Sequence, residues 1–138
     1  MGVVLPYTRV RGPDGSTARK PYLWTVLRHG ERFTPVVNLL VDTGSEFCIF
    51  DATLARRLLA LDVESGGRAA VMSGIDGRDV RAHVHPIRIF ARDLKREFEI
   101  REAYFCNLRG LAGVLGHNGF PRSLGKSFEF EDPPDPEG

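Results

Sequence analysis

The chain has 138 residues, of which 42% are hydrophobic and 27% are charged, as expected for one soluble globular domain with a single core. Its 19 lysines and arginines nearly balance its 18 aspartates and glutamates, so the formal net charge is only +1. A nucleic-acid partner would favour a clustered basic face, and no apolar stretch is long enough to cross a bilayer. We therefore expect neither a nucleic acid nor a membrane as a partner.

Strand patterns and turns alternate through the first part of the chain. The cluster Gly-Pro-Asp-Gly-Ser at 12–16 is a strong turn signal, and His-Gly-Glu at 29–31 indicates a hairpin turn. Residues 1–20 are expected to form an N-terminal arm ahead of the main domain. Strands are predicted at 3–10, 22–27 and 33–41.

One clear helix is predicted over residues 52–61. Asp51 fits the N-cap position, because its carboxylate can accept a hydrogen bond from a backbone amide of the first turn. The side chains of Leu54, Leu58 and Leu61 recur at helical spacing, so this face of the helix is expected to pack on the core.

The second half of the chain is built around one hairpin. Strand-like residues at 69–72 and 80–90 are joined through Gly74-Ile75-Asp76-Gly77, and Asp-Gly at its tip matches a turn with positive backbone dihedrals. Many short strands with turns between them predict an all-β, barrel-like domain over 21–131. Further elements are strands at 98–105, 114–116 and 127–131, a short helix or turn at 117–124, and a disordered acidic, proline-rich tail at 132–138.

Two cysteines, Cys48 and Cys106, lie in apolar runs. Two cysteines do not make a disulfide framework, so we interpret both as small buried hydrophobes in a reducing compartment, the cytoplasm. A catalytic thiol is a weak alternative, because no histidine motif accompanies either cysteine.

The stretch Leu39-Leu40-Val41-Asp42-Thr43-Gly44-Ser45 carries the strongest candidate chemistry. Its apolar run predicts a buried strand that ends on a carboxylate where core gives way to cleft. Gly44 lets the backbone turn sharply, and Thr43 and Ser45 can hydrogen-bond the carboxylate or nearby backbone. Asp, Thr and Gly are also ordinary turn residues, but a second apolar-apolar-glycine stretch, Val114-Leu115-Gly116, favours a functional site.

These two stretches resemble those of retropepsin-type aspartic proteases, which are single-lobed and work as dimers. The first resembling segment is Asp42-Thr43-Gly44-Ser45, and the second is Val114-Leu115-Gly116-His117-Asn118-Gly119-Phe120. The order and spacing are similar from about Trp24 to Phe130, and the second segment looks closer to bacterial and cellular members than to viral ones. The resemblance implies a small closed all-β barrel of retropepsin type with one or two short helices.

The resemblance also implies an aspartic endopeptidase. Peptide hydrolysis of this kind needs two carboxyls that share a proton, and this chain has only one Asp-Thr-Gly. The second carboxylate would be Asp42 of another copy, so the enzyme would be a homodimer. Water would attack a peptide or protein substrate, with neither a metal nor another cofactor.

Around Asp42, the resemblance assigns supporting roles. Thr43 would bond across the two-fold axis, Gly44 would let its amide approach the carboxylate, and Ser45 would hydrogen-bond the carboxylate from its outer side. His117 takes the place of an arginine that helps to hold the viral dimer. The apolar shelf under the loop would be Val114, Leu115 and Gly116, and the substrate-binding flap would be Gly74, Ile75, Asp76 and Gly77.

Two other functions compete with this one. A retropepsin-like dimer could bind peptides or scaffold other domains without catalysis, since a fold alone does not establish an activity, but such a module has no need for the carboxylate of Asp42. Alternatively His83 and His85, on one side of a strand, could bind a metal with Asp79 or Asp76. No third histidine supports this metal hydrolase, and both histidines are more often solvent-facing strand residues.

Overall fold

The computed structural model describes residues 3–42, 44–73, 77–117, 119 and 128–132. Within them the chain forms twelve strands and one short helix, and that helix is too short to span a membrane. The elements are β1 (Val3–Pro6), β2 (Thr8–Arg11), β3 (Thr17–Lys20), β4 (Tyr22–His29), β5 (Arg32–Phe33), β6 (Val37–Val41), β7 (Cys48–Asp51), α1 (Ala52–Leu59), β8 (Arg68–Ser73), β9 (Asp79–Ala91), β10 (Arg96–Cys106), β11 (Gly113–Leu115) and β12 (Phe128–Glu131).

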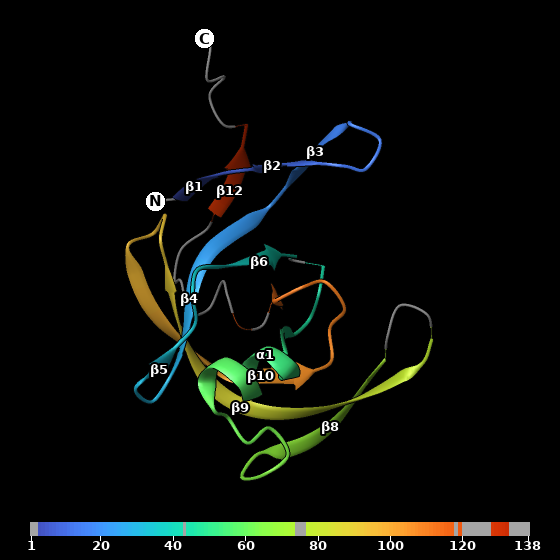
Figure 1. Cartoon of the computed structure of the whole chain (residues 1–138), viewed down its shortest axis with the longest axis vertical. Helices are drawn as coiled ribbons and strands as arrows, with labels where there is room; N and C mark the ends of the chain where they lie inside the picture. The colour runs from blue at the N-terminus through green and yellow to red at the C-terminus, as the bar shows by residue number, and fades with distance from the viewer. Residues whose placement is uncertain (1–2, 43, 74–76, 118, 120–127, 133–138) are drawn as a thin grey trace.

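Eight strands form the main sheet, in the order β5-β4-β6-β11-β7-β10-β9-β8. An additional pairing of β4 with β9 closes the six strands from β4 to β9 in this order into a barrel, which surrounds the core in Figure 1. A closed barrel leaves only β5 and β8 as edges of this sheet. The prediction of an all-β, closed-barrel fold is therefore confirmed.

Alternating burial explains why these segments form the barrel wall. On β4, Leu23 and Leu27 are fully buried while their neighbours along the strand are half-buried or exposed, and Leu39 on β6 is fully buried as well. A strand turns successive side chains to opposite faces, so this alternation sends one face into the core. Each leucine fully buried in this way contributes about 1.5–3 kcal/mol to folding.

The predicted strand at 33–41 is two strands in the structure. Thr34 interrupts it: its backbone amide donates to the carbonyl of Leu27 at 2.9 Å, and its hydroxyl accepts from the Leu27 amide at 3.0 Å. The next residue is Pro35, which has no amide hydrogen to give to a ladder. The chain therefore leaves β5 at Phe33 and re-enters the sheet at Val37 as β6.

Helix α1 begins where it was predicted to begin. A carboxylate oxygen of Asp51 accepts a hydrogen bond from the amide of Leu54 at 3.1 Å, which confirms the N-cap. The helix ends at Leu59, before residue 61, because Ala60 adopts a left-handed conformation with φ 52°.

The predicted core face of α1 was wrong in part, because Leu58 is 41% exposed. The helix packs against β7 and β10, and the face that points there carries small residues, which allow close approach to the barrel. Leu61 is buried as expected, but it lies beyond the helix. The buried helix residues are Ala52, Ala55 and Leu59.

The terminal strands form two small sheets beside the barrel. β1 pairs with β12 in parallel, and β2 pairs with β3 as an antiparallel hairpin, which we call the arm. Both lie at the same end of the molecule in Figure 1. The predicted single strand at 3–10 is broken at Tyr7, whose amide donates to the carbonyl of Glu131 at 2.9 Å and whose ring packs on Phe130 at 5.3 Å between centroids.

Candidate active site

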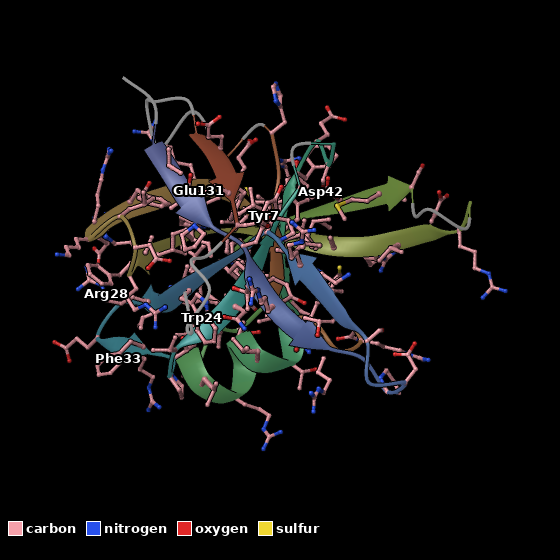
Figure 2. All side chains as sticks on the ribbon, turned by 90° about the horizontal axis from the view of Figure 1, so that it is seen from above. Tyr7, Trp24, Arg28, Phe33, Asp42 and Glu131 are labelled. Atoms are coloured by element: carbon pink, nitrogen blue, oxygen red, sulfur yellow. The ribbon has the colours of Figure 1, made fainter. Side chains whose placement is uncertain are left out.

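Asp42 follows the last residue of β6, as the sequence predicted. The side chains of Leu39 and Val41 are buried in the barrel, whereas Asp42 is exposed. In Figure 2, Asp42 and Phe33 lie on opposite sides of the view. An apolar strand thus holds one carboxylate at the surface with its backbone fixed by the barrel.

The strand beside β6 is β11, which is inserted between β6 and β7. β11 runs parallel to β6, with Val114 opposite Leu40, and antiparallel to β7. The amide of Asp42 extends the β6–β11 pairing by donating to the carbonyl of Leu115 at 3.0 Å. We call β6, β11, β7 and the loop at 42–47 the Asp42 crossing. The structure therefore brings the Asp42 stretch and the Val114–Gly116 stretch together, although 71 residues separate Asp42 from Gly113.

Two hydrogen bonds between residues close together in the sequence hold the loop after Asp42. The Gly44 amide donates to the Asp42 carboxylate at 3.0 Å, and the Ser45 amide donates to the Asp42 carbonyl at 3.0 Å. The approach of the Gly44 amide is the one expected of that residue. The first of these bonds holds the Asp42 carboxylate against its own loop.

The Ser45 hydroxyl has a different partner from the one that the resemblance implied. It donates to the carbonyl of Phe47 at 3.0 Å rather than to the Asp42 carboxylate. The Phe47 carbonyl lies only two residues further along the chain, within hydrogen-bonding distance of the hydroxyl. Ser45 therefore stabilises the far side of the loop.

Gly116 packs directly against the backbone of the loop in the Asp42 crossing. A Cβ on Gly116 would collide with the carbonyl oxygen of Phe47 and lie 2.8 Å from that of Ser45, so only glycine fits. The Gly116 amide donates to the sulfur of Cys48 at 3.3 Å, and the next amide, of His117, donates to the Ser45 carbonyl at 2.7 Å. The predicted shelf thus contacts the Asp42 loop directly.

A row of apolar side chains crosses the barrel wall next to Asp42. Pairing places Leu40, Val114, Ile49 and Tyr104 opposite one another on four neighbouring strands, and residues paired in this way share a face of the sheet. Leu40 lies two residues before Asp42, so alternation puts Asp42 on the same face. An extended apolar surface therefore adjoins the carboxylate.

Sequence analysis did not find that surface. Phe47 packs on Tyr104 with 4.6 Å between ring centroids, and both join a second apolar cluster that includes Met72 on β8 and Val80 on β9. Its members are scattered between residues 47 and 108, and only the strand order brings them together. The apolar alternation at Phe47 and Ile49 was the one available signal.

The hairpin of β8 and β9 covers this cluster. β8 pairs with β9 from Arg68 opposite Val84 to Ser73 opposite Asp79, which confirms the hairpin. The flap tip assigned to Gly74, Ile75 and Asp76 lies outside the described residues. Gly77, the fourth of the set, has φ 79°, a conformation that favours glycine.

Other predicted participants fall partly outside the described residues. Thr43 and Asn118 do so, as do Phe120 and most of the predicted turn at 117–124. His117 is described and exposed at the surface, with its amide bound to the loop as given above.

The structure argues against the metal site at His83 and His85. His85 is buried, which corrects the expectation that it faces solvent, and its Nε2 lies 2.6 Å from the carbonyl oxygen of Val63. Because a carbonyl oxygen only accepts, that nitrogen donates its proton there and has no lone pair for a metal. Among the residues that the structure describes, no three His, Cys, Asp or Glu side chains are placed to hold a metal ion. Asp76 lies outside those residues.

Both cysteines are buried, as predicted. Burial, and after it the negative charge of Asp51, raise the pKa of the Cys106 thiol. A nucleophilic thiol needs a lowered pKa. Cys106 is therefore an inert core residue rather than a catalytic nucleophile.

Comparison with known proteins supports the fold. No family model and no curated protein matches the chain. Among solved structures, the EIAV protease complexed with the inhibitor HBY-793 is similar, with a TM-score of 0.55 and 18% sequence identity, over 78% of this chain and 90% of that chain. At this identity the likeness concerns the fold alone. Together with the closed six-strand barrel, it shows that the chain has a retropepsin-like fold.

Proposed function

We propose that this protein is an aspartic endopeptidase whose catalytic centre is built from Asp42 of two identical chains. The observation that carries the proposal is the Asp42 crossing: a buried strand ends on an exposed carboxylate, and the Gly44 amide orients it at 3.0 Å. The retropepsin-like fold supports the same function. A scaffold protein would have no use for a carboxylate held in this way.

The chemistry requires a second acid close to the first. Two carboxyls about 3 Å apart cannot both ionise, so they share one proton. The ionised one acts as a general base that takes a proton from water, and the protonated one donates its proton to the carbonyl oxygen of the scissile bond. The two groups titrate as a pair. A homodimer with its two-fold axis beside Asp42 would provide this arrangement.

The substrate would be a peptide bound in an extended conformation. The β8–β9 hairpin lies across the apolar cluster and would add strand-like hydrogen bonds to the peptide backbone. Apolar side chains of the substrate would pack on the row that contains Leu40 and Ile49. These contacts would place the scissile carbonyl over the shared proton, which is the positioning that hydrolysis needs.

The decisive experiment compares Asp42→Asn with the unaltered protein on a peptide library at pH 3–7. We expect the variant to lose at least about 100-fold in cleavage rate, the lower range for a missing general acid–base group, while it unfolds at the same temperature and remains dimeric. Asp62→Asn is the matched control, because Asp62 is exposed and lies outside the crossing. Equal activity of Asp42→Asn and the control would end the proposal.

The dimer is tested separately by dilution. When the protein is dilute enough to dissociate, cleavage activity should rise with the square of its concentration, and analytical ultracentrifugation should detect the dimer over the same range. A monomer that remains active at every concentration would contradict the shared dyad. A dimer that binds library peptides without cleaving them would instead identify the non-catalytic peptide-binding module.

A further inference from the structure

The sulfur of Cys48 contacts both backbone polar groups of Gly116. The Gly116 amide donates a hydrogen bond to Sγ at 3.3 Å, and the thiol donates to the Gly116 carbonyl oxygen, with Sγ 3.8 Å from that oxygen. Cys48 is 1% exposed and belongs to the barrel core. A buried amide needs an acceptor, so this sulfur has a polar role in addition to filling space.

The peptide group between Leu115 and Gly116 links Cys48 to Asp42. Its carbonyl oxygen, on Leu115, accepts a hydrogen bond from the Asp42 amide at 3.0 Å, and its N–H is the donor to the Cys48 sulfur. A peptide group is planar and rigid, and hydrogen bonds arranged in a chain strengthen one another. A change at the sulfur is therefore passed to the backbone of Asp42 through two hydrogen bonds.

Two glycines leave the space that the sulfur occupies. A Cβ on Gly119 would collide with Sγ of Cys48, and Gly116, as described above, has no room for a Cβ either. The Gly119 amide donates to the Gly116 carbonyl oxygen at 3.4 Å, so the chain after β11 turns around the sulfur. Because protein interiors are close-packed, a larger group at position 48 would push this turn away. A side chain without a polar atom would leave the Gly116 amide without this acceptor.

We infer that Cys48 is a positioning residue for Asp42: through the Leu115–Gly116 peptide group, its sulfur fixes where the Asp42 backbone lies in the Asp42 crossing. This inference rests on the proposed function, because the position of Asp42 matters for catalysis only if its carboxylate reacts. Cys48 is buried and acts only through the backbone. In the proposed dimer, each chain would contribute one Cys48, so the placement of both carboxylates would depend on the same contact.

A positioning role has two consequences that a merely structural role does not have. A misplaced catalytic group lowers kcat and leaves KM nearly unchanged, and a displacement of about 1 Å can cost about 100-fold in rate. Two carboxyls that share a proton stay singly protonated over a range of pH, and this range narrows as the two groups move apart. Loss of the Cys48 contact should therefore lower kcat and narrow the pH–rate profile.

The kinetic test compares Cys48→Ala with Cys106→Ala on a peptide that the full chain cleaves. Cys106 is also buried, but it belongs to the second apolar cluster, so its alanine variant reports the loss of a buried sulfur alone. We expect Cys48→Ala to lose about 10- to 100-fold in kcat, with a narrower pH–rate profile, and Cys106→Ala to keep both. Cys48→Ser retains an acceptor for the Gly116 amide and should exceed the alanine variant by at least about threefold in kcat. If Cys48→Ala does not fold, Cys48→Ser is compared with Cys106→Ser in the same way.

Amide hydrogen exchange, followed by NMR, tests the contact without activity. In Cys48→Ala the amides of Asp42 and Gly116 should exchange at least about tenfold faster, whereas the Leu108 amide, which donates to Asp51 at the other end of β7, should not change. Unchanged exchange at Asp42 and Gly116 would overturn the inference. So would full kcat and an unchanged pH profile in Cys48→Ala while Asp42→Asn is inactive. If Asp42→Asn keeps its activity, the proposed function fails by itself, and the exchange rates then decide whether Cys48 holds the Asp42 backbone.

Discussion

The Asp42 crossing and the arm are both built from short strands, yet they are held in opposite ways. In the crossing, Leu39 is fully buried and Gly116 lies so close to the Phe47 carbonyl that no side chain fits. In the arm, every residue of β3 is exposed, and Trp24 of the barrel donates a hydrogen bond to the hydroxyl of Thr8 in the arm. Close packing leaves the crossing no freedom to relax, whereas the arm is held by polar contacts that water can replace.

This difference shows that the position of the Asp42 carboxylate is fixed by close packing, whereas the position of the arm is not. In the proposed dimer, the Asp42 carboxylate would have to be placed to within a fraction of an ångström to share a proton with its counterpart, and a close-packed interior would transmit any change to it. The arm meets no such demand. Substitutions that affect only one of the two regions should therefore differ greatly in effect.

The largest effect is expected for Gly116→Ala, with Gly12→Ala as the matched change in the arm. Neither glycine has a positive φ, so only space distinguishes them. Alanine at 116 must displace the Phe47 backbone, at a cost of up to about 3 kcal/mol. At 12 its nearest neighbour is the flexible Asp14 carboxylate at 3.1 Å, and the change should stay within about 0.5 kcal/mol. Urea unfolding measures both, and equal losses would remove the contrast.

The next effect is expected at the end of β7, where Asp51 serves two partners. Its carboxylate accepts from the Leu54 amide at 3.1 Å and from the Leu108 amide at 2.9 Å. Asp51→Ala removes both bonds and should lower the free energy of unfolding by about 2 kcal/mol. Asp51→Asn keeps one acceptor oxygen and should lose about half as much. Identical losses in the two variants would mean that charge, rather than hydrogen bonding, is what matters here.

A smaller effect is expected where the arm meets the barrel. Thr8→Val removes the acceptor for the Trp24 indole and should cost about 1 kcal/mol or less. Thr17→Val, on the exposed strand of the same hairpin, is the control. The chain has a single tryptophan, so its fluorescence should shift in Thr8→Val and not in the control. An unchanged spectrum would show that this bond does not hold the arm.

The smallest effect is expected on the outer barrel surface, at Glu97. Its hydrogen bond from Arg88, and the charges of Arg28 and Arg88, lower the pKa of this carboxyl. A carboxyl with a lowered pKa in the folded state stabilises the protein above its unfolded pKa, and this stabilisation is lost as pH falls through the folded pKa. The difference in unfolding temperature between the unaltered protein and Glu97→Gln should thus be present at pH 7 and begin to shrink as the pH falls below about 4.3, where an ordinary Glu titrates. It should vanish once the pH is below the lowered pKa of the folded state. A difference that persists at pH 2 would contradict this origin.

Much of this architecture could be predicted from local patterns. Alternating apolar residues predicted the strands of the barrel, Asp51 predicted the start of α1, and the apolar run before Asp42 predicted a buried strand that ends on an exposed acid. Each of these depends on residues within about one turn or one strand, where a side chain meets the same neighbours in any context.

The features that local patterns did not predict depend on contacts between segments that are far apart in the sequence. Leu58 follows helical spacing, but the helix packs on the barrel with the face that carries Ala55. His85 is buried, and the carbonyl oxygen of Val63 accepts a hydrogen bond from its ring nitrogen. The grouping of Arg9, Arg11 and Arg19 on one face of the arm was not predicted either. These arginines become neighbours only when β2 pairs with β3.

The sequence by itself determined that one acid ends a buried strand, that a glycine-containing turn follows it, and that each chain has a single such motif. Only the tertiary structure decided that β11 enters between β6 and β7, and which apolar side chains lie beside Asp42. The physical reason is that hydrogen bonding along the chain is fixed by neighbouring residues. Strand order and register depend on how the whole core is filled, and no local pattern specifies that.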